Sequence, residues 1–281
     1  MPSWEYHRRQ KQLVTTKAST PDYDASYCKV MGCPYPARAA GTDGFDSRFC
    51  RQHHEHRQRH GSPYQGTYSA TILNPYRQAA LSWLLDHADD IWVKDALGRV
   101  SGLYRKAGPH QEAFRLTGLK PRERAWAHWA RMRKHEVNPV LPVAAWVAVE
   151  MVIANDPQAV ATKEFKQVQA AKLIHRMASG THKQWDQAAR SVAASGAAVQ
   201  VASDRGSVPQ VKELHVFPRS RGRVLRHIGG DLDQATELLV DHCLPDVQAF
   251  KTQRDIEFPG RFTGRPHSRH LGGRKRQRKG G

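Results

Sequence analysis

Three cysteines and one histidine near the N-terminus have the spacing of a metal site. They are Cys28, Cys33, Cys50 and His53, in the pattern Cys-x4-Cys-x16-Cys-x2-His. Zn²⁺ prefers four nitrogen or sulfur ligands in a tetrahedron, and two short-spaced pairs joined by a loop supply them without straining the chain. The x2 gap places a Cys and a His on one face at the start of a helix. The spacing therefore predicts a zinc site with His53 as the fourth ligand.

Three further histidines, His54, His56 and His60, follow closely and are alternatives for the fourth ligand. A set of three cysteines and one histidine closes the coordination sphere, and Glu55 is the only carboxylate close behind the ligands. Catalytic zinc sites keep a position open for water beside an acid or base. We therefore expect the zinc to be structural. Disulfides are not expected, because no targeting signal points to an oxidising compartment.

The residues around these ligands form a longer motif. In residues 27–38 a glycine precedes the second cysteine, and in residues 48–63 the Cys-x2-His pair leads into a basic run that ends in His-Gly. This motif resembles a small zinc module of bacteriophage and mobile-element proteins, some of which are HNH-type endonucleases. The resemblance covers about 36 of the 281 residues and implies a basic helix from Arg51 to His60. The central loop, Ala39 to Ser47, is longer than in that module. No HNH catalytic pattern follows, so nuclease activity is not implied.

The composition indicates a polyanionic partner. The chain of 281 residues has 44 Lys and Arg against 26 Asp and Glu, a net charge of +18, and a pI near 10.1. Such a charge favours nucleic acid as the partner, and we expect DNA rather than RNA. The most apolar run, residues 140–154, contains Pro142 and Glu150 and is shorter than the ~20 residues that span a bilayer. We expect no membrane partner, and a cytoplasmic location in a bacterial or phage-infected cell, because no apolar signal-peptide region follows Met1.

The fold class expected from the sequence is mainly α: a small N-terminal zinc-binding module, an all-α domain and a disordered basic tail. A flexible basic arm over 1–26 precedes the module at 27–63, the helical domain spans 75–255, and the tail spans 259–281. The tail has eight Arg and Lys and no acid, so it cannot bury a core. It would bind phosphates strongly and without sequence preference.

Hydrophobic periodicity and turn residues place the helices of this domain. Asn74-Pro75 is expected to start one helix, with Pro75 at its first position. The run 141–153 is apolar all round and is expected to be the buried central helix. One strand is expected over 211–217. Further helices are expected over 111–117, 122–136, 158–178, 184–201 and 231–243.

The candidate nucleic-acid contacts are basic residues on helices, loops and the tail. In helix 122–136 the tryptophans Trp126 and Trp129 are expected to be core residues, while the arginines either contact phosphate or are only solvated. In the loop before the last helix, Gly222 would allow close approach to a phosphate. The candidates are Arg51, Arg57, Arg59, Arg124, Arg131, Lys134, Arg219, Arg221, Arg223, Arg274, Lys275, Arg276, Arg278 and Lys279.

Two alternatives to a non-enzymatic DNA-binding protein stay open. One is a metal-dependent nuclease or recombinase-like enzyme, in which Asp233, Glu237 and Asp241, spaced four apart on one helix face, would hold a divalent ion. Such a stripe is more often the wet side of a helix, and no Walker loop, G-x-S-x-G or H-E-x-x-H motif is present. The other is a structural RNA-binding component of a ribonucleoprotein, whose helical domain would dock on a protein partner.

Overall fold

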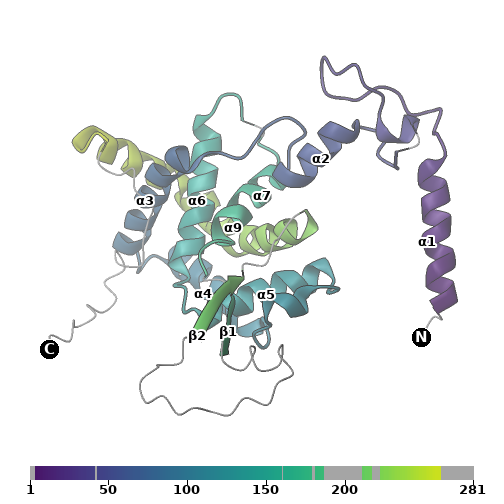
Figure 1. The fold of residues 1–281 in the computed structure, drawn as a ribbon. Helices are drawn as coiled ribbons and strands as arrows, with labels where there is room; N and C mark the ends of the chain where they lie inside the picture. The colour runs from purple at the N-terminus through teal and green to yellow at the C-terminus, as the bar shows by residue number, and fades with distance from the viewer. Residues whose placement is uncertain are drawn as a thin grey trace, which may run out of the picture.

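The structure, a computed structural model, describes residues 4–41, 43–159, 161–178, 181–186, 211–216 and 222–260. The chain is mainly α, as the sequence predicts (Figure 1). The helices of the body are α3 (Ala70–Asp86), α4 (Ile91–Lys106), α5 (Pro121–Lys134), α6 (Val140–Asn155), α7 (Lys163–Ile174) and α9 (Arg223–Glu257). We call residues 70–257 the helical body. None of the helices in the described part of the chain is long and apolar enough to cross a membrane.

Helix α6 is the centre of the helical body. Thirteen of its 16 residues are buried, and α3, α7 and α9 pack around it. The prediction of an apolar central helix is confirmed. Its one buried acid, Glu150, is paired with Lys166 of α7 at 2.6 Å, so its charge is compensated where the helix meets its neighbour.

Helix α9 is much longer than the predicted segment 231–243. It has 35 residues, which corresponds to about 50 Å, and it packs against each of α3 to α7 (Figure 1). Its inner face buries Leu232, Leu239 and Cys243, so Cys243 is a core residue, as the sequence suggests. Where α9 crosses α7, a side chain on Gly229 would collide with the backbone of Gln167. The crossing is therefore close, which the pattern of apolar residues alone does not reveal.

Two helices begin elsewhere than predicted. Helix α3 starts at Ala70, because the Ser69 side chain accepts a hydrogen bond from the Ile72 backbone N–H, and Pro75 lies inside the helix instead of at its first position. Helix α7 starts at Lys163 and not at residue 158, because Thr162 caps it in the same way. In both cases a hydroxyl cap sets the boundary and a nearby proline misled the prediction.

The remaining differences from the predictions lie outside the six helices of the body. Residues 1–26 were expected to be a flexible arm, but Trp4–Ser19 form the helix α1, which buries none of its residues and stands apart from the body (Figure 1). Part of the predicted helix 184–201 is instead the strand β1 (Thr181–Asp186), antiparallel to β2 (Val211–Val216) with Thr181 opposite Val216. Strand β2 matches the predicted strand. The rest of 184–201 and nearly all of the predicted tail lie outside the described residues. In place of the predicted helix 111–117 there is a short 3₁₀ helix, Ala113–Leu116.

Candidate metal centre and basic surfaces

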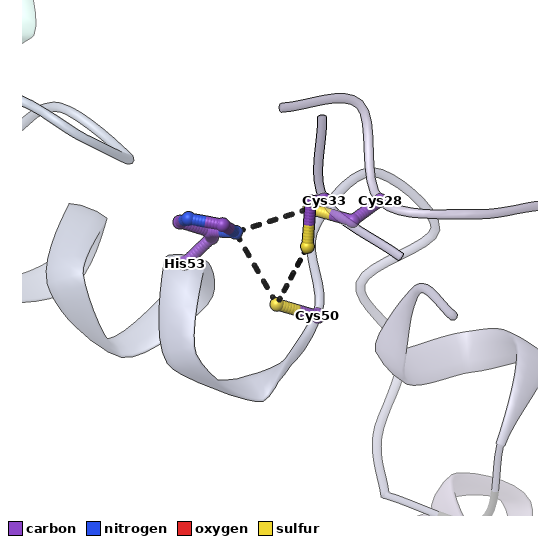
Figure 2. Close-up of side chains that lie close together, drawn as sticks. All are labelled: Cys28, Cys33, Cys50 and His53. Carbon is purple, nitrogen blue, oxygen red and sulfur yellow. Dashed lines mark hydrogen bonds between the residues drawn. The ribbon is translucent and has the colours of Figure 1, made fainter. Parts of the chain in front are cut away.

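The three cysteines and His53 come together at the start of α2 (Arg51–His60) (Figure 2). All four ligand atoms lie within 4.8 Å of one another. The Nδ1 atom of His53 lies 3.4 Å from the Cys28 Sγ and 3.3 Å from the Cys50 Sγ, and the Cys33 and Cys50 Sγ atoms are 3.9 Å apart. Cys28 and Cys33 come from the preceding loop, Cys50 is the residue before α2, and His53 lies in its first turn. This cluster could hold one metal ion.

The electrostatics of the cluster suit a cation. Burial alone would raise the pKa of Cys28, but hydrogen bonds from the backbone at Cys50 and Val30 lower it, which favours the thiolate that metals bind. A backbone hydrogen bond at Tyr35 would lower the pKa of Cys33 too, yet burial and the neighbouring sulfurs raise it. Three adjacent thiolates repel one another, and a cation between them removes that repulsion.

The other three histidines have partners elsewhere, so the structure selects His53 from the four candidates. The Nδ1 atom of His54 lies 2.6 Å from the Oδ2 of Asp46, and the Nδ1 of His56 lies 2.9 Å from the Ser62 carbonyl oxygen. His60 is stacked on His56, and its Nδ1 lies 2.9 Å from the Thr67 hydroxyl.

The long central loop is tied to α2 through Asp46. This carboxylate pairs with His54 and accepts a hydrogen bond from the Arg48 backbone N–H at 2.9 Å. These contacts, together with Arg48, lower the pKa of Asp46 although burial acts in the opposite direction. The Asp46 carbonyl oxygen also accepts from the Ala39 N–H, which closes the loop. We call residues 27–63, with the cluster and α2, the metal module.

The metal module is seated on the helical body through one carboxylate, that of Glu164 on α7. Arg57 of α2 donates to it from Nε at 3.1 Å, and Arg226 of α9 donates from Nε at 2.6 Å. Arg226 also donates to the carbonyl oxygens of Arg57 and Gln58, near the end of α2. Gly61 ends α2 with φ +82°, and a Cβ there would lie 2.7 Å from the Glu164 carbonyl oxygen.

Some of the predicted nucleic-acid contacts are exposed to solvent, and others are paired or buried within the protein. Arg51 and Arg59 are exposed on α2, and each is paired only loosely with Glu55, at 3.4 Å. Two of the predicted contacts are engaged within the structure: Arg57 donates to Glu164, and Arg131 is 3% exposed inside the body. Lys134 and Arg223 are exposed and Arg124 is half-buried. The remaining candidates, Arg219, Arg221, Arg274, Lys275, Arg276, Arg278 and Lys279, lie outside the described residues.

The acidic stripe does not form a metal site in the described part of the chain, where the Cys/His cluster alone groups enough ligands. Asp233 is paired with Lys163 at 2.9 Å and accepts from Gln167, while Glu237 and Asp241 are exposed. The tryptophan pair behaves largely as expected. Trp129 is buried and donates to Asp231 at 2.9 Å, and half-buried Trp126 packs under Arg122.

Some functional residues were missed by the sequence analysis. Nothing in the sequence links Arg57 to Glu164 and Arg226, each of which lies more than a hundred residues from it. Gln169 carried a signal, because it lies four residues after the buried Phe165 on the inward face of α7, where a polar residue is unusual.

Comparisons with known proteins leave the site to be interpreted from its geometry. No protein-family model, no curated protein and no solved structure matches the chain.

Proposed function

We propose that the protein binds nucleic acid, DNA in preference to RNA, and does so without catalysis through a module folded around zinc. One observation carries the proposal: the Cys₃His cluster lies at the first turn of a helix that exposes two arginines, Arg51 and Arg59. A closed ligand set of this kind is typical of structural zinc, and it presents a short helix that could not be stable alone.

Three of the distances within the cluster are close to those expected around zinc. Bonds of about 2.3 Å to sulfur and about 2.1 Å to nitrogen in a tetrahedron give S···S edges of about 3.8 Å and S···N edges of about 3.6 Å. The cluster has 3.9 Å for the one and 3.3–3.4 Å for the other. Thiolate and imidazole ligands also favour zinc over the hard cations, which select oxygen. Cys28, Cys33, Cys50 and His53 would thus hold the ion.

The surface next to the cluster supports a phosphate partner. Arg51 and Arg59 have side chains 72% and 66% exposed, and their pairs with Glu55 are the surface type that contributes about 0–1 kcal/mol. A phosphate can therefore replace Glu55 at little cost. Helix α1 adds three exposed basic side chains, Arg8, Arg9 and Lys17, and none of its residues is buried. The basic residues after Phe258 would add contacts that are blind to sequence.

The experiment is a salt series of fluorescence-anisotropy titrations with duplex DNA, single-stranded DNA and structured RNA. The full chain and a truncation after Phe258 are compared, each with bound zinc and after chelation. We expect both proteins to bind duplex DNA more tightly than RNA at matched salt, and chelation to weaken the truncated protein most.

The double variant Arg51→Ala/Arg59→Ala tests the helix directly. It should reduce the slope of log K against log salt by about 1.8 on duplex DNA, since each lost phosphate contact contributes about 0.9. The matched control is Lys94→Ala/Arg105→Ala, which removes the same charge from exposed positions on α4. Equal slopes for both double variants would contradict a role for α2. Binding that vanishes with the tail would show that the folded part is not the contact, and tighter RNA binding would favour the ribonucleoprotein alternative.

A further inference from the structure

A cavity of about 860 Å³ lies where the metal module meets the helical body. Its wall is made by the last turn of α2, the chain at Thr67 and Tyr68, the start of α3 and the end of α7. Pockets of about 300–1,000 Å³ hold small organic ligands. The cavity is therefore large enough for a ligand of that size and not only for a small ion.

The lining of this cavity is strongly basic. No described lining residue has a carboxylate, and apolar side chains such as Leu73 and Leu225 complete the wall. Cationic walls of one sign in a partly enclosed space concentrate anions. The basic lining residues are Arg59, His60, Arg77, Lys172, His175 and Arg176.

Gln169 is the second, independent indication of a ligand. Its side chain is 0% exposed and lines the cavity, and neither its Nε2 nor its Oε1 has a hydrogen-bond partner among the described residues. Buried amides in proteins are almost always hydrogen-bonded, and an unpaired one costs about 1–3 kcal/mol. Its N–H groups can donate to an anionic oxygen, and its carbonyl can accept from a hydroxyl or ring N–H of the same ligand.

Lys172 places a positive charge in the wall. Its Nζ donates to the Thr67 hydroxyl at 2.6 Å and lies 3.2 Å from the Nδ1 of His60, and no carboxylate of the described residues is paired with it. Burial, reinforced by the charge of Lys172, lowers the pKa of His60 to about 4, so the imidazole is neutral and accepts from Thr67. The Lys172 ammonium thus lacks a counter-charge in the wall.

A further cation lies behind the wall. Arg131 is 3% exposed and donates to the carbonyl oxygen of His175, a lining residue, at 3.3 Å. Its other partner is the neutral side chain of His128, at 3.0 Å. Among the described residues no carboxylate neutralises Arg131. A buried charge of this kind destabilises the fold unless an anion lies near it.

We propose that this cavity binds the phosphate group of an organic phosphate, with Lys172 and Gln169 as contacts to the phosphate. The ligand is either a free mononucleotide or the 5′-terminal nucleotide of a nucleic-acid strand. Phosphate matches the cationic lining, and the apolar wall and the Gln169 carbonyl suit the organic part. Arg51 and helix α1 do not line this cavity and can bind duplex without it, so the inference goes beyond the proposed function.

The test is isothermal titration calorimetry of the full chain with four probes. These are inorganic phosphate, the common 5′-mononucleotides, and one short single-stranded oligonucleotide with and without a 5′-phosphate. We expect saturable binding of a mononucleotide, or of the phosphorylated oligonucleotide in clear preference to the unphosphorylated one. The first result identifies a free ligand and the second a strand end.

Two variants test the assigned contacts. Lys172→Met should weaken binding by about tenfold or more, because it removes a charged hydrogen bond to the phosphate. Gln169→Leu should also weaken binding, yet raise the thermal midpoint of unfolding, because it removes an unpaired buried amide. A purely structural glutamine would give the opposite stability change. Lys163→Met is the matched control, since Lys163 is exposed on the same helix and outside the cavity.

Three results would overturn the proposal. They are no saturable binding of any phosphate probe, equal binding of the oligonucleotide with and without its 5′-phosphate when no mononucleotide binds either, and unchanged binding by Lys172→Met and Gln169→Leu. Circular dichroism confirms that the variants are folded, and Lys172→Gln replaces Lys172→Met if the latter is not folded. Duplex binding is measured in parallel, so a failure of the cavity is distinguished from a failure of the proposed function.

Discussion

The metal module and the helical body are stabilised in opposite ways. The body buries large side chains such as Trp129, Trp146 and Phe165 in one continuous core around α6. The module has no buried side chain larger than cysteine among its described apolar residues, and α2 buries none of its ten residues. An isolated helix of that length is marginal in water. The module therefore depends on its ligand cluster for the stability that the body draws from apolar packing.

This difference determines which side chains each region can offer to a binding partner. Because no side chain of α2 is buried, half of its ten residues stay exposed to a partner. The body uses its helix faces for packing, and even charged residues such as Arg131 and Glu150 are drawn inside. The two regions meet at the contacts of Glu164 and at the close approach of Gly61, so each should respond to its own perturbation.

Loss of the metal should have the largest effect. Structural zinc contributes about 10–16 kcal/mol in small zinc-finger peptides, so chelation or Cys50→Ser should unfold the module. Hydrogen exchange should show rapid exchange over residues 27–60, while α6 keeps its protection. Metal analysis should find close to one zinc per chain before chelation and none after it. Slow exchange over α2 in the metal-free protein would show that the module does not need the ion.

Removal of a large core side chain should destabilise the body and leave the metal module unchanged. Trp146→Ala should destabilise the body by about 3–5 kcal/mol, measured by denaturant unfolding, because a buried indole is lost from α6. Zinc content at temperatures below the transition should not change. Joint loss of the metal and the core transition would mean that the two regions form one cooperative unit.

The junction should respond to Gly61→Ala by about 1–3 kcal/mol. The new Cβ would meet the backbone of Glu164 and Phe165, and alanine is disfavoured at φ +82°. We expect a lower midpoint of thermal unfolding with the zinc retained. Gly66→Ala is the control, because a Cβ there meets nothing within 4 Å. Equal midpoints for the two variants would show that the module is not seated as described.

A dependence on pH is expected at the same junction. Burial and the charge of Arg176 lower the pKa of Lys172 to about 8, whereas an unfolded lysine titrates near 10.4. Between these values the folded chain binds fewer protons than the unfolded one, so stability should rise as pH rises from about 8 to about 10.4. Neighbouring His60 stays neutral throughout this range. Parallel stability curves for the native chain and Lys172→Met would contradict the assignment.

The sequence predicts the features that depend on local spacing. The ligand cluster was found because its four ligands form two short-spaced pairs that lie close together in the sequence. Helix α6 was found because a helix buried on every side reads as one apolar run. The strand at 211–216 was found because a short segment with valine at both ends suits a strand.

Features that depend on distant partners could not be predicted in the same way. Arg57 and Arg59 look alike in sequence, yet only Arg57 faces Glu164, which is 107 residues away. Arg131 lies on the inner face of α5, and its basic type alone suggested the surface. Helix α1 has no apolar face for a periodicity argument to detect. The start of the alanine-rich stretch 184–201 belongs to β1 because it pairs with β2. Helix propensity describes local preference and cannot predict such pairing.

The shared carboxylate of Glu164 has a consequence for the order of synthesis. Residues that reach it lie at positions 57 and 226, so the ribosome completes the metal module long before it makes the second arginine. The ligands of the cluster all lie within residues 28–53, and their loops can close as soon as that stretch has emerged. The orientation of the module is therefore set only late in translation. Until α9 is made, a nascent chain would carry a folded, basic module on a tether.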